Sequence, residues 1–226
     1  MNISRINPAG SRGRQRKAIV KDILMKRDFR ALVDWYVTER MAVRTLSSLL
    51  FETDPLVCMR AAEALGRVTP QEYKQNPERV TQLLRRLFWQ LNDESGNLGW
   101  FAPQAIAEIL ANIPALIEEH GRVLVSFLPE EPFETGVRWG LARIAAVKPG
   151  AFEGTAAAPL LIRSLDDSDK DIMTFSLFAL GHLGVPVEKE KLVPFLDDPH
   201  EIDIYDWTTG DFYRTSASEL SEVLIK

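Results

Sequence analysis

The stretch AAEALGRV at residues 61–68 decides the fold, because the same pattern returns three more times along the chain. It aligns without gaps with IAEILANI (106–113), GLARIAAV (140–147) and SLFALGHL (176–183). Small residues such as Ala64 and Gly66 recur in all four segments, at positions where two helices would press together. Stacked helical pairs need such close contacts, since each pair buries its apolar surface only against its neighbours. The repeated register therefore predicts a stacked array of helices rather than a closed bundle.

A second repeated signature precedes these helices: a leucine that ends one helix, followed by an acidic turn. It occurs five times, as LFETDP (50–55), LNDES (91–95), LPEEP (128–132), LDDSD (165–169) and LDDPH (196–200). The leucines are 41, 37, 37 and 31 residues apart, a spacing typical of HEAT-type units of two helices. Asp and Ser before a helix accept hydrogen bonds from its free N–H groups, and negative charge suits the positive end of the helix dipole.

Apolar residues at helical spacing dominate the rest of the chain, for example from Phe29 to Val37 and from Val80 to Leu91. Only IDIYDWTTGDFY (202–213) alternates apolar and polar residues, which predicts a small β-hairpin that turns at Thr-Gly-Asp. We therefore predict an all-α fold, an α-solenoid of about five HEAT-like helical pairs with a small hairpin insertion near the C-terminus.

Charge is distributed unevenly along the 226 residues, whose net charge is −5. Residues 1–30 carry nine Lys and Arg against two Asp, whereas the last forty residues carry ten acidic side chains against four basic ones. A basic start of this kind is typical either of an arm that binds nucleic acid or an acidic partner, or of a solvated tail. We expect residues 1–13 to form a flexible basic arm and residues 14–226 to form a single solenoid domain.

RAAEALGRV (60–68) and LDDSDKDIMTFSLFALGHLG (165–184) resemble the HEAT-like repeats found in phycobilisome-lyase-type proteins. The resemblance covers about residues 45–200 and implies the solenoid fold; such repeats serve many functions, so it does not specify one. Deoxyhypusine hydroxylases of the same fold carry several His-Glu dipeptides that hold two irons. This chain has only His200-Glu201, so the resemblance does not extend to a di-iron site.

Residues with catalytic potential are few and scattered. Cys58 lies in an apolar helical segment, where a buried thiol is inert. The histidines at 120, 182 and 200 are far apart and have no cysteine pair beside them, so the spacing of a zinc site is absent. No phosphate loop or nucleophile elbow occurs. We predict no catalytic residue, no metal and no cofactor, and favour a protein that is not an enzyme.

Three places offer residues for binding a partner: the loop 92–100 with its two glycines and Trp100, the Arg138-Trp139 pair with Arg143, and the aromatic hairpin. Trp and Arg are enriched in the energetic centres of interfaces. Each place also has a purely structural interpretation. The loop is then a long turn with an aromatic plug, Trp139 is a core residue, Arg138 pairs with Glu134, and the hairpin caps the end of the solenoid. A hairpin that reaches over the groove, or that pairs with a second chain, is a further alternative. The candidate partner-binding residues are Asp93, Glu94, Asn97, Trp100, Gln104, Arg138, Trp139, Arg143, His182, Tyr205 and Trp207.

The function predicted from these features is a non-catalytic interaction or scaffolding module that binds another protein in its concave groove. One alternative, implied by the resemblance, is a factor that acts on a tetrapyrrole like a bilin lyase. A second is a HEAT-like alkylpurine DNA glycosylase, with Trp100, Asp93 and Arg138-Trp139 in the groove. A groove for duplex DNA needs many basic residues, and the chain beyond residue 30 is acidic, so we do not expect nucleic acid as the partner. The lack of a signal peptide and of an apolar run of about 20 residues favours a cytoplasmic protein without a membrane span.

Overall fold

The computed structural model describes residues 8–92 and 99–225, and within them the chain forms twelve α-helices and one two-stranded sheet. The bounds are α1 (Pro8–Met25), α2 (Phe29–Thr38), α3 (Ala42–Leu49), α4 (Pro55–Gln75), α5 (Pro77–Gln90), α6 (Ala102–Asn112), α7 (Ile117–Ser126), α8 (Glu134–Val147), α9 (Ala157–Arg163), α10 (Lys170–Leu183), α11 (Lys189–Leu192), β1 (Glu201–Asp206), β2 (Asp211–Ser216) and α12 (Ala217–Ile225). The predicted solenoid with its C-terminal hairpin is confirmed.

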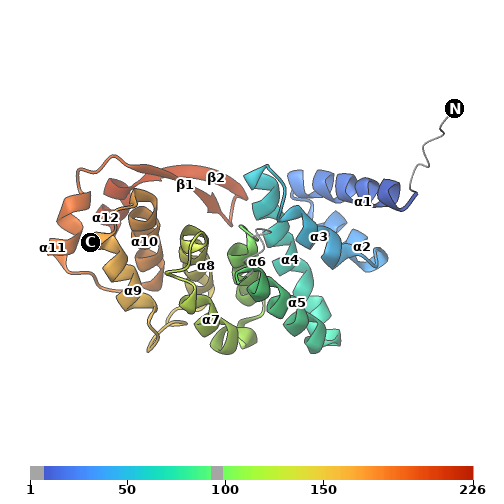
Figure 1. Cartoon of the computed structure of the whole chain (residues 1–226), viewed down its shortest axis with the longest axis horizontal. Helices are drawn as coiled ribbons and strands as arrows, with labels where there is room; N and C mark the ends of the chain where they lie inside the picture. The colour runs from blue at the N-terminus through green and yellow to red at the C-terminus, as the bar shows by residue number, and fades with distance from the viewer. Residues whose placement is uncertain (1–7, 93–98, 226) are drawn as a thin grey trace.

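Five helical pairs follow one another along the array: α3 with α4, α5 with α6, α7 with α8, α9 with α10, and α11 with α12. The second helices form a row in which α4 packs on α6, α6 on α8 and α8 on α10 (Figure 1). Helices α1 and α2 lie at the amino-terminal end of the row. The four aligned segments of the sequence all fall on this row, so the repeated register did mark the contacts between repeats.

Small residues allow the second helices to approach closely. A Cβ atom placed on Gly66 of α4 would lie only 2.7 Å from the carbonyl oxygen of Glu108 on α6. The middle of the row is accordingly buried on all sides: residues 61–66, 102–103 and 105–111 all lie in the interior. This dense packing makes the row the core of the molecule.

Acidic turns cap two of the second helices, α4 and α10, whereas α6 and α8 follow Phe101 and Phe133 without a side-chain cap. The Asp54 side chain accepts a hydrogen bond from the Leu56 N–H at 3.0 Å, and that of Asp169 accepts from the Asp171 N–H at 2.8 Å. Pro55 occupies the first turn of α4, where its missing N–H has no helical partner. These caps set the start of α4 and of α10.

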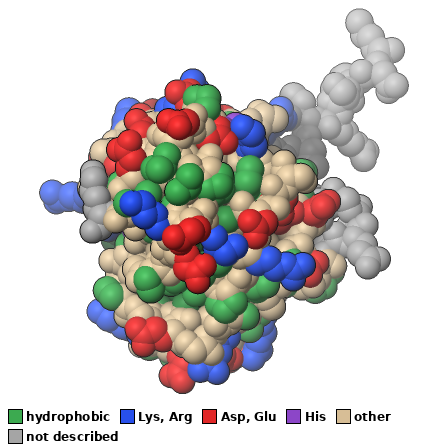
Figure 2. Space-filling view, turned by 90° about the vertical axis from the view of Figure 1, so that its left-hand side faces the viewer, with side chains coloured by type: hydrophobic (Ala, Val, Ile, Leu, Met, Phe, Trp, Pro, Cys, Tyr) green, Lys and Arg blue, Asp and Glu red, His purple; other side chains and the backbone are tan. Residues whose placement is uncertain are grey.

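The two ends of the chain differ from expectation in detail. Helix α1 begins at Pro8, so it includes residues 8–13 of the segment expected to be a basic arm. Of the apolar stripe from Phe29 to Val37, only Leu32 is fully buried, because α2 lies at the edge of the array. At the opposite end Val193 and Val223 are exposed, and Figure 2 shows hydrophobic side chains there among acidic and basic ones. The hairpin does not cap this end.

Candidate partner-binding surfaces

The hairpin lies across the row of second helices. It interrupts the fifth repeat between α11 and α12, and it runs along the array toward α4 (Figure 1). β1 and β2 are antiparallel, with Ile204 opposite Tyr213 and Tyr205 opposite Phe212. Ile202, Ile204 and Tyr205 of β1 are buried, whereas only Thr215 of β2 is. We call the surface of α4, α6, α8 and α10 that the hairpin covers the helix-row face.

Arginines hold the tip of the hairpin through its main chain. Arg27, in the turn between α1 and α2, donates hydrogen bonds to the carbonyl oxygens of Thr208 at 3.0 Å and Trp207 at 3.2 Å. Arg60 of α4 donates to the Gly210 carbonyl at 3.0 Å. Gly210 has a φ of +75°, and a Cβ atom on it would collide with the Arg27 side chain. Only glycine therefore fits this turn without strain.

A buried carboxylate joins the hairpin to the amino-terminal half of the array. Glu63 of α4 is 2% exposed and accepts hydrogen bonds from Arg27 at 2.7 Å, Arg67 at 3.3 Å and the Tyr205 hydroxyl at 2.8 Å. Burial and the neighbouring Glu63 charge raise the pKa of Tyr205 well above its ordinary value, so this hydroxyl stays a donor. The Glu63–Tyr205 bond connects residues 142 positions apart in the chain.

Trp139 of α8 and Trp207 of the hairpin pack edge to face, with ring centroids 5.8 Å apart. The Trp139 indole N–H donates to the Tyr205 carbonyl oxygen at 2.9 Å. His182 of α10 also contacts Trp207, at 5.2 Å between ring centroids. Five of the predicted partner-binding residues thus meet on the helix-row face, where they contact the hairpin and one another: Trp139, Arg143, His182, Tyr205 and Trp207.

Arg143 also forms a buried ion pair across two repeats. Its Nε lies 2.8 Å from a carboxylate oxygen of Glu108, and its guanidinium carbon lies 5.5 Å from the centre of the Trp207 ring. Glu108 is 1% exposed, and its burial raises the pKa of the carboxyl group against the opposing effect of Arg143. A carboxylate this deeply buried is stable only with a paired cation.

Arg138, beside Trp139 in the sequence, points away from the hairpin because neighbouring positions on a helix face in different directions. It is 3% exposed and donates to the Ser176 and Ser164 hydroxyl oxygens, at 2.8 and 2.7 Å, and to the carbonyl oxygens of Leu128 and Glu134. All four acceptors are neutral, and burial lowers the pKa of Arg138 to about 10. Arg138 therefore connects α8, α10 and two turns inside the array.

The remaining predicted residues lie at the start of α6. Trp100 is 59% exposed, and Gln104 is half-buried with a side-chain oxygen that accepts no hydrogen bond from the described part of the chain. Asp93, Glu94 and Asn97 lie outside the described residues. Trp100 and Gln104 are not covered by the hairpin, so they stay candidates for contact with a partner.

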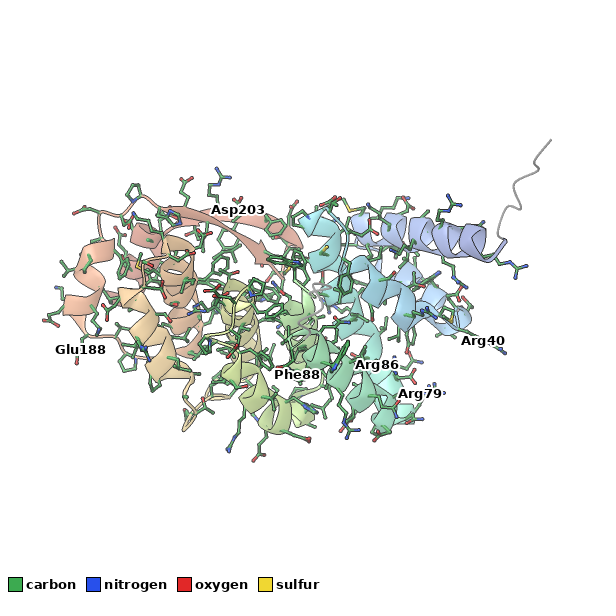
Figure 3. All side chains as sticks on the ribbon, viewed as in Figure 1. Arg40, Arg79, Arg86, Phe88, Glu188 and Asp203 are labelled. Carbon is green, nitrogen blue, oxygen red and sulfur yellow. The ribbon has the colours of Figure 1, made fainter. Side chains whose placement is uncertain are left out.

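An open groove at the amino-terminal end of the array was missed by the sequence analysis. It has a volume of about 800 Å³ and is lined by α2, α3, the end of α4, and α5. Four arginines line it, and we call it the arginine groove: Arg40, Arg44, Arg79 and Arg86 (Arg40, Arg79 and Arg86 are labelled in Figure 3). Arg40 and Arg44 are close together in the sequence, as are Arg79 and Arg86, but 35 positions separate Arg44 from Arg79. The only signal that could have found them is the basic charge of residues 1–90, which carry 17 Lys and Arg against nine Asp and Glu.

A second open groove, with a volume of about 1020 Å³, lies between the turns that precede α8 and α10. Its carboxylates largely serve the fold: Asp169 caps α10, and Asp166 pairs with Lys191 at 3.2 Å. The two grooves have opposite charge, since acidic side chains outnumber basic ones in this lining and arginines outnumber carboxylates in the arginine groove.

Reactive groups in the described ranges are buried or isolated. Cys58 is fully buried, and burial raises the pKa of its thiol to about 11, so little thiolate exists near neutral pH. Among residues 8–92 and 99–225, no three His, Cys, Asp or Glu side chains are placed to hold a metal ion. No helix of this part of the chain is both long and apolar enough to span a membrane.

Comparison with known proteins adds one relative and two similar folds. No protein-family model matches the chain. An uncharacterised protein of Archaeoglobus fulgidus is 30% identical over 183 residues, which cover 80% of this chain and 94% of that protein. An engineered protein superposes with a TM-score of 0.56 at 19% identity, over 94% of this chain and 90% of the other. A designed armadillo repeat protein superposes with a TM-score of 0.51 at 18% identity, over 87% and 90%. At such identities these structures show an armadillo-like repeat fold and nothing about function.

Proposed function

This chain belongs to the same family as the uncharacterised Archaeoglobus fulgidus protein, and we propose that it is a non-catalytic scaffold that binds another protein. One observation carries the proposal: the hairpin covers the helix-row face, while grooves and an exposed tryptophan outside it stay open to a partner. The proposal moves the expected binding surface away from the face of the second helices.

The contacts between the hairpin and the helix-row face support a binding surface outside this face. Arg27, Arg60 and Trp139 direct their donors at carbonyl oxygens of the hairpin, and Glu63 and Glu108 are saturated by arginines and Tyr205. A partner that bound there would have to displace buried Ile204 and Tyr205 and leave these donors unpaired. A partner that binds outside the hairpin meets no such cost.

A non-catalytic function is supported by the use of the polar groups. Each buried arginine serves the fold, since Arg60 and Arg138 bond to carbonyl or hydroxyl groups and Arg143 bonds to Glu108. The Cys58 thiol is inaccessible. The assignment of residues 14–226 to one domain, and partner contacts by Asp93, Glu94 and Asn97, stay part of the proposal.

The test is affinity capture from the source cell with the purified protein, followed by quantitative mass spectrometry and absorbance spectroscopy. The proposal predicts one protein captured in stoichiometric amount, with reduced capture by Trp100→Ala or by charge reversal in the arginine groove. Trp89→Ala is the matched control, because Trp89 is also exposed, at 66%, but its side chain lines neither groove. Capture of no protein would contradict the scaffold function.

The same preparation separates the two alternatives. A tetrapyrrole factor, implied by the phycobilisome-lyase-type resemblance, would copurify with a visible absorbance band. A glycosylase would retain duplex DNA with a steep dependence on salt concentration. Arg138 and Trp139, which that enzyme would need in its groove, are both buried in this fold.

A further inference from the structure

Three of the four arginines that line the arginine groove have no carboxylate partner among the residues that the structure describes. The Arg79 side chain pairs with Glu72 at 2.9 Å, but the guanidinium groups of Arg40, Arg44 and Arg86 form no ion pair or hydrogen bond with any residue in the described ranges. All three are exposed at the surface of the groove. Elsewhere in the molecule, arginines near a carboxylate are drawn into pairs with it, as Arg27 and Arg143 are.

The acidic side chains of the groove are already occupied. Glu72 accepts a hydrogen bond from the Tyr36 hydroxyl at 2.6 Å in addition to its pair with Arg79, and this lowers the pKa of the Glu72 carboxyl group. Glu39 lies 3.8 Å from Arg16 and accepts a hydrogen bond from the Met41 N–H at 3.0 Å. The lining thus carries four arginines against two engaged carboxylates, which leaves a net positive groove in a chain whose net charge is −5.

The rest of the lining suits a polypeptide. The apolar lining of the groove includes Val37, which is 66% exposed, together with Val43 of α3 and the buried Leu83 of α5. Amide side chains, each with donors and an acceptor for peptide groups, complete the lining at Gln71, Gln75, Gln82 and Gln90. Guanidinium groups pair with carboxylates through two parallel hydrogen bonds, which fixes the geometry of such a contact. A nucleic acid would instead need a continuous series of basic residues along its phosphates, and Glu39 and Glu72 would repel it.

Building on the scaffold function proposed above, we infer that the arginine groove binds an acidic segment of the partner protein. Arg40, Arg44 and Arg86 pair with its carboxylates, and the valines and glutamines contact its intervening residues and main chain. The positive charge of the groove also attracts the negatively charged segment and raises its association rate. This effect weakens as salt concentration rises.

The probe for the test is a short fluorescein-labelled peptide that alternates glutamate with alanine, titrated with the purified chain and followed by fluorescence anisotropy. The test variant combines Arg40→Glu, Arg44→Glu and Arg86→Glu. The matched control combines Arg122→Glu, Lys148→Glu and Lys189→Glu, three exposed cations outside the groove, so both variants have the same net charge. We expect about tenfold or greater loss of affinity in the test variant and less than about twofold loss in the control. Circular dichroism and the unfolding midpoint verify that both variants fold.

Three results would overturn the inference: no binding of the glutamate peptide, equal loss in both variants, or tighter binding of a single-stranded oligonucleotide with the same dependence on the three arginines. A version of the peptide with glutamine in place of glutamate must bind more weakly. Because the probe is synthetic, it tests the groove independently of the capture experiment. Capture of a partner protein that is insensitive to the groove variant would refute the groove inference and leave the scaffold function standing.

Discussion

Arginines line both the helix-row face and the arginine groove, yet the two surfaces use them differently. On the helix-row face, Arg27 and Arg143 pair with buried carboxylates and Arg60 donates to main-chain carbonyls of the hairpin. In the groove, Arg40 and Arg86 are exposed and have no partner in the described part of the chain. An arginine therefore indicates a binding surface only where its hydrogen-bonding capacity is left unused. The first surface holds the fold together, and the second is available to another molecule.

Removal of a carboxylate from the helix-row face is the strongest way to break this comparison. Glu108→Ala leaves the Arg143 guanidinium buried without its partner, and we expect a loss of about 3–5 kcal/mol in the free energy of unfolding. Urea denaturation followed by tryptophan fluorescence measures it. The double variant Glu108→Leu with Arg143→Met, which removes both charges, should regain most of that loss. A loss below about 1 kcal/mol in the single variant would mean that the pair does not stabilise the row.

The docking of the hairpin tip predicts the next largest effect. Gly210 and Gly154 both have positive φ, at +75° and +70°, but only a side chain at 210 meets Arg27, since the space around Gly154 is open. Gly154→Ala should cost about 1 kcal/mol through backbone strain alone, and Gly210→Ala about 2–3 kcal/mol. Limited proteolysis should cleave the hairpin faster only in Gly210→Ala. Equal behaviour of the two variants would show that the tip does not depend on its contacts with the helices.

His120 sharpens the comparison, because it is buried without any charge partner. It is 6% exposed, packs against Phe88, and its Nε2 has no hydrogen-bond partner among the described residues. Burial lowers the pKa of His120, with Glu119 and Arg85 exerting smaller, opposing effects. The unfolded chain therefore takes up a proton at His120 below about pH 6.5, where the folded chain does not, so stability is lost as pH falls from 6.5 through the folded pKa.

His120→Leu should reduce this acid-side loss of stability, measured as urea midpoints between about pH 7 and pH 5. His200→Gln is the control, because His200 contacts Asp171 at the surface and is not enclosed by the core. An unchanged pH profile in His120→Leu would contradict the assignment.

Much of the fold could be predicted from the sequence, because its signals are local. The aligned segments from 61 to 183 record close helix contacts that recur in each repeat, and the acidic turns record caps that act within three residues, as at Asp54 and Asp169. The alternation at 202–213 gave the hairpin, observed over Glu201–Ser216. Each of these patterns is set by neighbours in the chain.

The position of the hairpin and the exposure of the candidate residues could not be predicted in the same way. Tyr205 meets Glu63 across 142 positions, and no local pattern encodes such a contact. The alignment of the repeats gave the register of the helix that carries Trp139, but it did not reveal that the hairpin would cover this side chain. Arg40 lies in the turn between α2 and α3, Arg44 on α3 and Arg86 on α5, so only the folded chain brings all three together.

The most direct test of the contrast between the two surfaces compares Arg60→Ala with Arg86→Ala, each measured for stability and for affinity toward the glutamate peptide. Arg60→Ala should lose about 1–3 kcal/mol in the free energy of unfolding, because three carbonyl groups lose their donor, and its folded form should bind the peptide as the wild type does. Arg86→Ala should change stability by less than about 0.5 kcal/mol and weaken peptide binding several-fold. If the two variants lost stability and affinity in the same proportion, the distinction between a closed helix-row face and an open arginine groove would be wrong.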